Sequence, residues 1–162
     1  MGFRNILVEG PDCSGKSKVV ERLKNTLKWD SKSLHHKEGN QFLRYLKEYA
    51  NAEQIVFDRG HISEGVYSCL WRGGVPFSIG EKKILDDLIK NGFLLIFACP
   101  SIEVLKKRYL ERSFKQQIKI EELEKSRELF IENLADFSPI IYFSDNLQEL
   151  DSLIELIRGK LK

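Results

Sequence analysis

The sequence predicts an α/β protein in which a five-stranded parallel sheet is covered by helices on both faces, a three-layer arrangement. Short apolar runs of strand length alternate along the chain with segments whose apolar residues recur at helical spacing. A glycine-rich loop at residues 10–17 joins the first apolar run to the first amphipathic segment. The alternation favours parallel strands with helical crossovers, and the loop is typical of a tight turn between a strand and a helix.

In the first part of the chain, the apolar run at 3–9 predicts a strand, and the spacing of apolar residues in 19–27 predicts the helix after the loop. Residues 33–36 predict a short, weak strand. Helical spacing returns at 42–49, and the continuous apolar run at 54–57 predicts a buried strand.

In the middle of the chain we expect a helix at 61–71 and another that begins near Ser78 and ends near residue 92. The most apolar run, 93–99, predicts a central strand. Ser101 is a suitable N-cap for the helix that follows it.

The last part begins with a polar, basic break at 112–119. A long helix is expected at 120–136, the last strand at 140–143, and a closing amphipathic helix at 147–161.

The chain of 162 residues has the length of one domain, which we expect to span residues 1–162. Its content of 42% hydrophobic and 31% charged residues is typical of a globular protein, and a formal charge of +2 does not indicate a nucleic-acid-binding protein. Cys13, Cys69 and Cys99 lack metal-type spacing, so we expect reduced thiols and a cytoplasmic location. The longest apolar run is too short to cross a bilayer, so no membrane partner is expected.

The loop at residues 10–17 fits the pattern G-x-x-x-x-G-K-[ST], which binds phosphate groups of nucleoside triphosphates. Gly10 and Gly15 allow the backbone to bend tightly, so that its N–H groups point inward at an anion. Lys16 is expected to reach the β- and γ-phosphates, and Ser17 to offer a hydroxyl to Mg²⁺. ATP and Mg²⁺ are therefore the expected cofactors. The predicted cofactor-binding residues are Gly10, Asp12, Cys13, Ser14, Gly15, Lys16 and Ser17.

Further polar residues follow the other predicted strands. In a parallel sheet, ligands bind beyond the carboxyl ends of the strands. This rule places residues 36–38, 58–59, 100–101 and 144–145 on the same rim as the phosphate loop.

Two longer patterns carry a resemblance to a known family. The first is Glu9-Gly10-x-Asp12-x-x-Gly15-Lys16-Ser17, and the second is Asp58-Arg59-x-x-x-Ser63-x-x-x-Tyr67 with Arg72-Gly73 after it. With these residues in register over most of its length, the chain resembles the thymidylate kinase family of nucleoside monophosphate kinases. The resemblance implies the P-loop kinase fold with strand order 2-3-1-4-5, and phosphoryl transfer from ATP to a deoxynucleoside monophosphate of the dTMP type.

The resemblance also implies roles for individual residues around the phosphates and the sugar. Asp58 would lie near the metal with Ser17, and Arg59 would bridge the acceptor phosphate and the transferred group. Asp12 would accept a hydrogen bond from the sugar 3′-hydroxyl. Tyr67 would pack under the sugar and disfavour a 2′-hydroxyl, although ordinary core packing is an alternative role for this ring.

The base pocket and the lid are implied in the same way. Ser63, Glu64 and Arg72 would line the base pocket, with helix capping as the alternative role of the first two. The segment around Glu38 loosely matches the family's T-R-E-P-G element on the substrate side. A lid at about residues 110–120 would supply Arg112 to the transferred phosphoryl group, since Cys13 stands where some members have an Arg. The other basic residues of this region are Lys106, Lys107, Arg108, Lys115 and Lys119.

Several alternatives stay open at this stage. The family's F-x-x-x-R base-stacking element has no clear equivalent, and Glu64 is a charged acceptor, so the base of the acceptor is undetermined. A kinase acting on a hydroxyl of a nucleoside, or of a modified base in DNA, is the second hypothesis, and a non-catalytic nucleotide-binding module is the third. Family members are often homodimers. The three histidines are not expected to take part in catalysis, because transfer to a phosphate needs no strong base.

Overall fold

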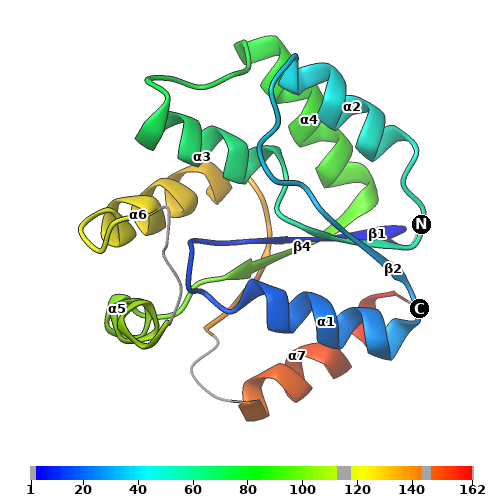
Figure 1. Ribbon diagram of the computed structural model, residues 1–162. Coiled ribbons are helices and arrows are strands. Elements are labelled where there is room, and N and C mark those ends of the chain that lie inside the picture. Colours follow the sequence, from blue (N-terminus) through cyan, green and yellow to red (C-terminus); the bar gives the residue numbers. More distant parts are fainter. Residues whose placement is uncertain (1–2, 113–117, 144–146, 162) are drawn as a thin grey trace.

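A computed structural model of the chain describes residues 3–112, 118–143 and 147–161. Strands and helices follow one another along the chain much as the sequence predicts (Figure 1). The elements are β1 (Asn5–Glu9), α1 (Lys16–Leu27), β2 (Asp30–Ser33), α2 (Gln41–Ala50), β3 (Ile55–Asp58), α3 (His61–Trp71), α4 (Ile79–Gly92), β4 (Phe93–Ala98), α5 (Ile102–Glu111), α6 (Glu122–Leu134), β5 (Ile140–Tyr142) and α7 (Leu147–Lys160).

The strands form a five-stranded parallel sheet in the order β2-β3-β1-β4-β5, which confirms the predicted order. Figure 1 shows α2, α3, α4 and α6 over one face of the sheet, and α1 and α7 over the other. The registers align Val8 of β1 and Ser33 of β2 with Asp58 of β3, so these three strands end together. Their carboxyl ends form the rim that carries the candidate site.

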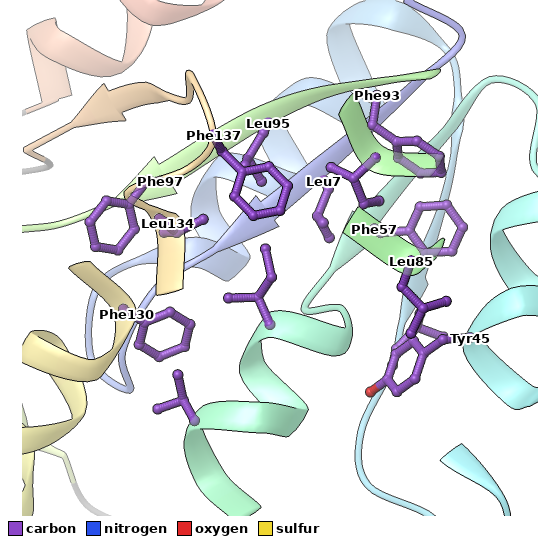
Figure 2. Packing of buried hydrophobic residues seen from close by; sticks show 14 of the residues in the cluster. Leu7, Tyr45, Phe57, Leu85, Phe93, Leu95, Phe97, Phe130, Leu134 and Phe137 are labelled. Carbon is purple, nitrogen blue, oxygen red and sulfur yellow. The ribbon is translucent and has the colours of Figure 1, made fainter. Parts of the chain in front are cut away.

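Two hydrophobic clusters hold the layers together, and successive residues of a strand point into different clusters. In β1, Leu7 belongs to the cluster on the α3 side, whereas Ile6 and Val8 belong to the cluster on the α1 side. All three side chains have no exposed surface, which fits a strand in the middle of the sheet. Figure 2 shows the larger cluster, in which aromatic rings such as Phe57 and Phe93 pack at 5.8 Å between centroids.

Most element predictions are confirmed, and the caps at Ser78 and Ser101 are present in the structure. The exception is β2, which was expected at 33–36 but occupies Asp30–Ser33. All four of its residues are exposed, because β2 is the edge strand, and an exposed polar edge strand has no apolar run to identify it. Leu34, the buried residue that suggested the strand, lies just after it.

Two predictions fall partly outside the described residues. Residues 113–117 of the expected lid and residues 144–145 of the expected rim lie outside the described residues. Within the described ranges, no helix combines the length and the apolar character needed to span a membrane.

Candidate active site

The glycine-rich loop lies between the end of β1 and the start of α1, as the motif requires. Gly15, immediately before α1, has φ +90°, and Cys13 has φ +66°, a left-handed conformation that is strained for a residue with a side chain. The amide of Ser14 donates to the carbonyl of Pro11 at 3.3 Å, which closes the loop into a tight turn. The loop therefore presents its backbone at the positive end of a 12-residue helix, an arrangement that suits an anion.

Gly10 is required at the first position of the loop because it lies against the neighbouring strand. Its φ of +148° is in the range that favours glycine, and a Cβ built there would lie 2.3 Å from the carbonyl oxygen of Ala98 in β4. The loop backbone thus packs directly on β4.

Lys16 is buried at the base of the loop with only 6% of its surface exposed. Its ammonium donates to the carbonyl oxygens of Gly10 and Pro11, each at 2.7 Å. Burial, with a smaller contribution from the nearby charge of Arg59, lowers the pKa of Lys16 to about 8 against the opposing effect of Asp12. The ammonium is held among loop carbonyls, from which it can reach phosphate oxygens bound in the loop.

Asp58 and Ser17 form the part of the site that fits a divalent cation. The Ser17 hydroxyl lies 3.5 Å from Oδ2 of Asp58, while Oδ1 of Asp58 is buried and has no hydrogen-bond partner among the described residues. A buried carboxylate oxygen without a donor is costly unless a cation or another ligand satisfies it. The described residues contain no group of three or more His, Cys, Asp or Glu side chains placed to hold a metal ion, so a Mg²⁺ ion here would take its remaining ligands from phosphate and water.

Arg59 joins the loop to the end of β3. Its Nη2 atom lies 2.5 Å from Oδ1 of Asp12, and its guanidinium carbon lies 5.3 Å from the centroid of the Tyr67 ring. The Tyr67 hydroxyl accepts the backbone N–H of Asp12 at 3.0 Å. Arg59 itself has φ +71°, so the backbone is strained at the residue that aims this guanidinium. The structure thus brings together Asp12, Arg59 and Tyr67, three of the residues predicted from the sequence.

Glu9 fixes the start of α3 next to this ion pair. Its Oε1 accepts the amides of Gly60 at 2.8 Å and of Ser63 at 3.3 Å, and the Ser63 hydroxyl donates to its other oxygen. Complete burial raises the pKa of Glu9 to about 7, against the opposing effect of these hydrogen bonds. A Cβ at Gly60 would lie 2.5 Å from the Tyr49 hydroxyl, so the chain must have glycine where it leaves β3.

A cavity of about 430 Å³ opens beside Arg59. Ser63, Glu64 and Tyr67 from α3 line it, so the predicted substrate-side residues lie along one wall. The hydroxyl of Ser63 is engaged by Glu9, whereas Glu64, with 4% exposure, is held by several donors. The remaining residues that line the cavity are Leu34, His35, His36, Arg59, Trp71 and Arg72.

The aromatic wall of the cavity is built by Tyr67 and Trp71, whose rings stack at 4.8 Å between centroids. The indole N–H of Trp71 points away to Glu122 at 3.4 Å, so the wall presents flat apolar surface. Glu38, the other predicted substrate residue, is exposed and lines an adjacent cavity of about 440 Å³ together with Arg72.

The predicted lid residue Arg112 lies at the end of α5, where its charge counteracts the burial that raises the pKa of Cys13. The structure also places Arg108 at the loop, where it donates to the carbonyls of Cys13 at 3.4 Å and Ser14 at 3.2 Å. Lys115 lies outside the described residues.

Two residues that the structure places in the site, Glu9 and Arg108, have no individual role in the sequence analysis. Glu9 stands in the first matched motif, and Arg108 belongs to the basic segment beside the predicted lid. His36, which the strand-end rule places on the rim, contacts Glu64 with Nδ1 at 2.8 Å from Oε1, a pairing that no spacing in the sequence indicates. Of the other histidines, His61 is buried in the core and paired with Asp86 at 2.8 Å.

The comparison with protein families gave no matching family model. Among proteins of known sequence, the chain is 26% identical over 136 residues to the uncharacterized SPbeta prophage-derived protein YorR of Bacillus subtilis. The match covers 81% of this chain and 82% of YorR.

The fold of the chain is similar to that of several solved structures. The chain resembles the crystal structure of YorR from Bacillus subtilis in complex with phosphorylated GDP, with a TM-score of 0.80, 22% identity and 95% of each chain covered. It also resembles deoxyadenosine kinase from M. mycoides, with a TM-score of 0.61, 21% identity and coverage of 97% and 98%. Shikimate kinase from Acinetobacter baumannii matches with a TM-score of 0.63, 14% identity and coverage of 99% and 96%. The parallel sheet in the order 2-3-1-4-5, flanked by helices, is the P-loop kinase fold that these structures share.

Proposed function

We propose that the protein is a kinase that transfers the γ-phosphoryl group of ATP to a deoxynucleoside monophosphate, giving the diphosphate. One observation carries the proposal. Arg59 belongs both to the phosphate end of the site, through its ion pair with Asp12 of the loop, and to the wall of the 430 Å³ cavity. A phosphate donor in the loop and an acceptor in the cavity would therefore meet at this guanidinium.

The chain's own residues supply the chemistry of transfer. The loop amides and Lys16 hold the donor phosphates, and Arg59 neutralises charge that grows on the transferred group. A Mg²⁺ ion held by Ser17 and Asp58 would neutralise charge on the donor phosphates. Arg112, with the rest of the predicted lid, is the candidate to cover the transferred group. Because the attacking phosphate oxygen is already anionic, the reaction proceeds by positioning and charge neutralisation and needs no general base.

Asp12 and Tyr67 are assigned to the sugar of the acceptor. Among the described residues, the Asp12 carboxylate is bonded through Oδ1, which leaves Oδ2 available to accept a hydrogen bond from a hydroxyl. Tyr67 is 4% exposed, and its ring is fixed between Arg59 and Trp71. A ring held this rigidly would favour a deoxyribose by excluding the 2′-hydroxyl.

Two of the similar structures support a nucleotide ligand. YorR was solved with phosphorylated GDP, and the M. mycoides deoxyadenosine kinase with dCMP and dCDP as products, as well as with dATP. Among acceptors, dTMP follows from the resemblance of the motifs. The polar side chains that line the cavity instead favour a base whose hydrogen-bonding edge differs from that of thymine.

A second candidate keeps the donor site and changes the acceptor to a nucleoside hydroxyl. Glu38 favours it, because an exposed carboxylate beside the cavity could take the proton from an attacking hydroxyl. A modified base in DNA belongs to the same reaction class, although a formal charge of +2 offers little attraction for a polyanion. If the acceptor is a hydroxyl, Glu38→Gln should abolish turnover. If the acceptor is a monophosphate, the same variant should retain turnover.

An acceptor screen separates these functions. The purified protein is incubated with ATP and Mg²⁺ and with each deoxynucleoside monophosphate, each deoxynucleoside, or single-stranded DNA. The proposal expects diphosphate product from at least one monophosphate and loss of that product in Lys16→Ala. Turnover of nucleosides or DNA alone would select the second candidate, and ATP binding without transfer to any acceptor would contradict both.

A further inference from the structure

Three polar side chains on the wall of the cavity are linked by hydrogen bonds into a row, in the order Arg72, Glu64 and His36. Oε1 of Glu64 accepts from Nη2 of Arg72 at 2.6 Å and from Nδ1 of His36 at 2.8 Å, so the carboxylate lies between the other two groups. Ser68 adds a third bond to the same oxygen at 3.2 Å. The side chain of Glu64 is only 3% exposed, which makes it the fixed centre of the row.

The bonds within the row leave a definite set of polar atoms for a ligand. Among the described residues, Oε2 of Glu64 accepts no hydrogen bond, and Arg72 bonds Glu64 and Ser68 through Nε and Nη2 alone. With Nδ1 donating to Glu64, a His36 ring that carries one proton has Nε2 as an acceptor. Read from Arg72 through Glu64 to His36, the row offers a donor, an acceptor and an acceptor.

We propose that this row recognises guanine, so that the acceptor is a guanine nucleotide; the inference rests on the kinase function proposed above. The Watson–Crick edge of guanine presents O6 as an acceptor, followed by N1–H and N2–H₂ as donors. That order is the complement of Arg72, Glu64 and His36. The buried carboxylate makes the central bond, and a charge-assisted bond is the strongest of its kind.

The other bases match the row less well. Adenine and cytosine place an amino group opposite Arg72 and a ring-nitrogen acceptor opposite the Glu64 carboxylate, which puts donor against donor and acceptor against acceptor. Thymine matches Arg72 and Glu64 but turns its O2 acceptor toward His36. A thymine acceptor would require His36 to act as a donor.

A purely structural ion pair between Glu64 and Arg72 explains less of the geometry. Such a pair accounts for the bonds to Oε1 but gives no use to Oε2, which accepts no hydrogen bond from the described residues and is not fully enclosed. Trp71, which stacks on Tyr67 and is only partly buried, lines the same cavity and offers aromatic surface to a base.

The test compares five acceptors, dGMP, dIMP, dTMP, dAMP and dCMP, by kcat/KM with ATP and Mg²⁺ and by equilibrium binding. We expect dGMP to exceed dTMP, dAMP and dCMP by at least about tenfold, because mismatched bases leave buried polar groups unpaired. Hypoxanthine lacks only the N2 amino group, so dIMP should be weaker than dGMP by about three- to tenfold.

Two variants assign the bonds to their residues. In Glu64→Gln the preference for dGMP over dAMP should fall by about tenfold or more, since an amide can offer either a donor or an acceptor. In His36→Phe the ratio of dGMP to dIMP should fall to about one, because the partner of the amino group is gone. Asp151→Asn, which alters an exposed ion pair with Arg22, is the matched control and should keep the wild-type ratios.

The outcomes of the test separate this inference from the proposed function. A preference for dTMP, dAMP or dCMP with turnover retained would overturn the guanine assignment while leaving the kinase intact. Guanine-selective binding without any transfer would support the row and contradict the kinase proposal. Variants that keep the wild-type ratios would show that the row does not read the base, and would overturn the inference.

Discussion

Arg59 and Asp12 form a short ion pair that ties the end of β3 to the phosphate-binding loop. Nη2 and Oδ1 are 2.5 Å apart, and the two side chains are only 24% and 15% exposed. The Tyr67 ring lies beside the guanidinium and holds the amide of Asp12 through its hydroxyl. The guanidinium is therefore oriented by the protein itself, which is the condition for electrostatic catalysis without reorganisation.

Arg59→Ala should lower kcat by about 10²- to 10³-fold, the effect typical of removing one preorganised donor from a transition state. Asp12→Asn keeps the size of the side chain but removes the charge that orients Arg59, so we expect a smaller loss of kcat and a higher KM for the acceptor. Steady-state kinetics on folded variants, with unfolding curves as the control, provides the measurement. A kcat of Arg59→Ala within threefold of wild type would rule out its assigned role.

The metal assignment predicts a change in Mg²⁺ dependence. Ser17→Ala and Asp58→Asn should raise the Mg²⁺ concentration needed for half-maximal activity by about tenfold or more, because the first removes an oxygen ligand and the second removes the negative charge of one. Titration of nucleotide binding with Mg²⁺ checks the same effect independently of turnover. Glu21→Gln, which alters another acidic residue of the groove next to Asp58, is the matched control and should keep the wild-type Mg²⁺ curve. Unchanged curves for both Ser17 and Asp58 variants would remove these residues from the metal site.

Glu9 predicts a pH dependence of stability. Its pKa is raised from 4.5 to about 7 in the folded protein, so between these values the folded state binds more protons than the unfolded chain. The free energy of unfolding should therefore fall as the pH rises from 4.5 to 7, by an amount on the order of 3 kcal/mol. Glu9→Gln keeps an oxygen for the amides of Gly60 and Ser63 but cannot titrate.

Urea unfolding of the wild type and of Glu9→Gln at pH 5.0 and 7.5 measures this contribution. The difference in unfolding free energy between the two proteins should shift in favour of the variant at the higher pH. If the unfolding free energies of the two proteins changed equally between these pH values, the pKa of Glu9 would not be raised by folding.

The close packing of the loop on β4 predicts opposite effects of alanine at two glycines. Gly10→Ala would force a Cβ to 2.3 Å from the Ala98 carbonyl and should destabilise the fold by about 2 kcal/mol or more. Gly80→Ala in α4, where nothing lies within 4 Å of a Cβ, should instead stabilise by about 0.5–1 kcal/mol. Equal stability of the two variants in urea would contradict the contact with β4.

The sequence predicted those parts of the molecule that are encoded by local patterns. The loop, α4 and the central strands combine continuous apolar runs with glycines and caps whose conformations have few alternatives. The edge strand β2 was misplaced, because its four exposed polar residues carry no burial signal. Its position is set by pairing with β3, which is a tertiary contact.

The candidate site likewise contains residues that local patterns predict and residues whose place depends on tertiary contacts. Asp12, Arg59 and Tyr67 were found because they stand at fixed spacings from the loop and from the end of β3. The role of His36 could not be read from the sequence, since it depends on where the segment after β2 passes α3. The burial of Glu9 and the approach of Arg108 to the loop likewise arise from packing between elements distant in the chain.

The most direct test of the account is the transfer of labelled γ-phosphate from ATP to a deoxynucleoside monophosphate, with the wild type and Lys16→Ala compared side by side. We predict label in a nucleoside diphosphate with the wild-type protein, and a loss of kcat by several orders of magnitude in the variant. Label that stays in ATP or appears only as inorganic phosphate with every monophosphate, in a protein that binds ATP, would contradict it.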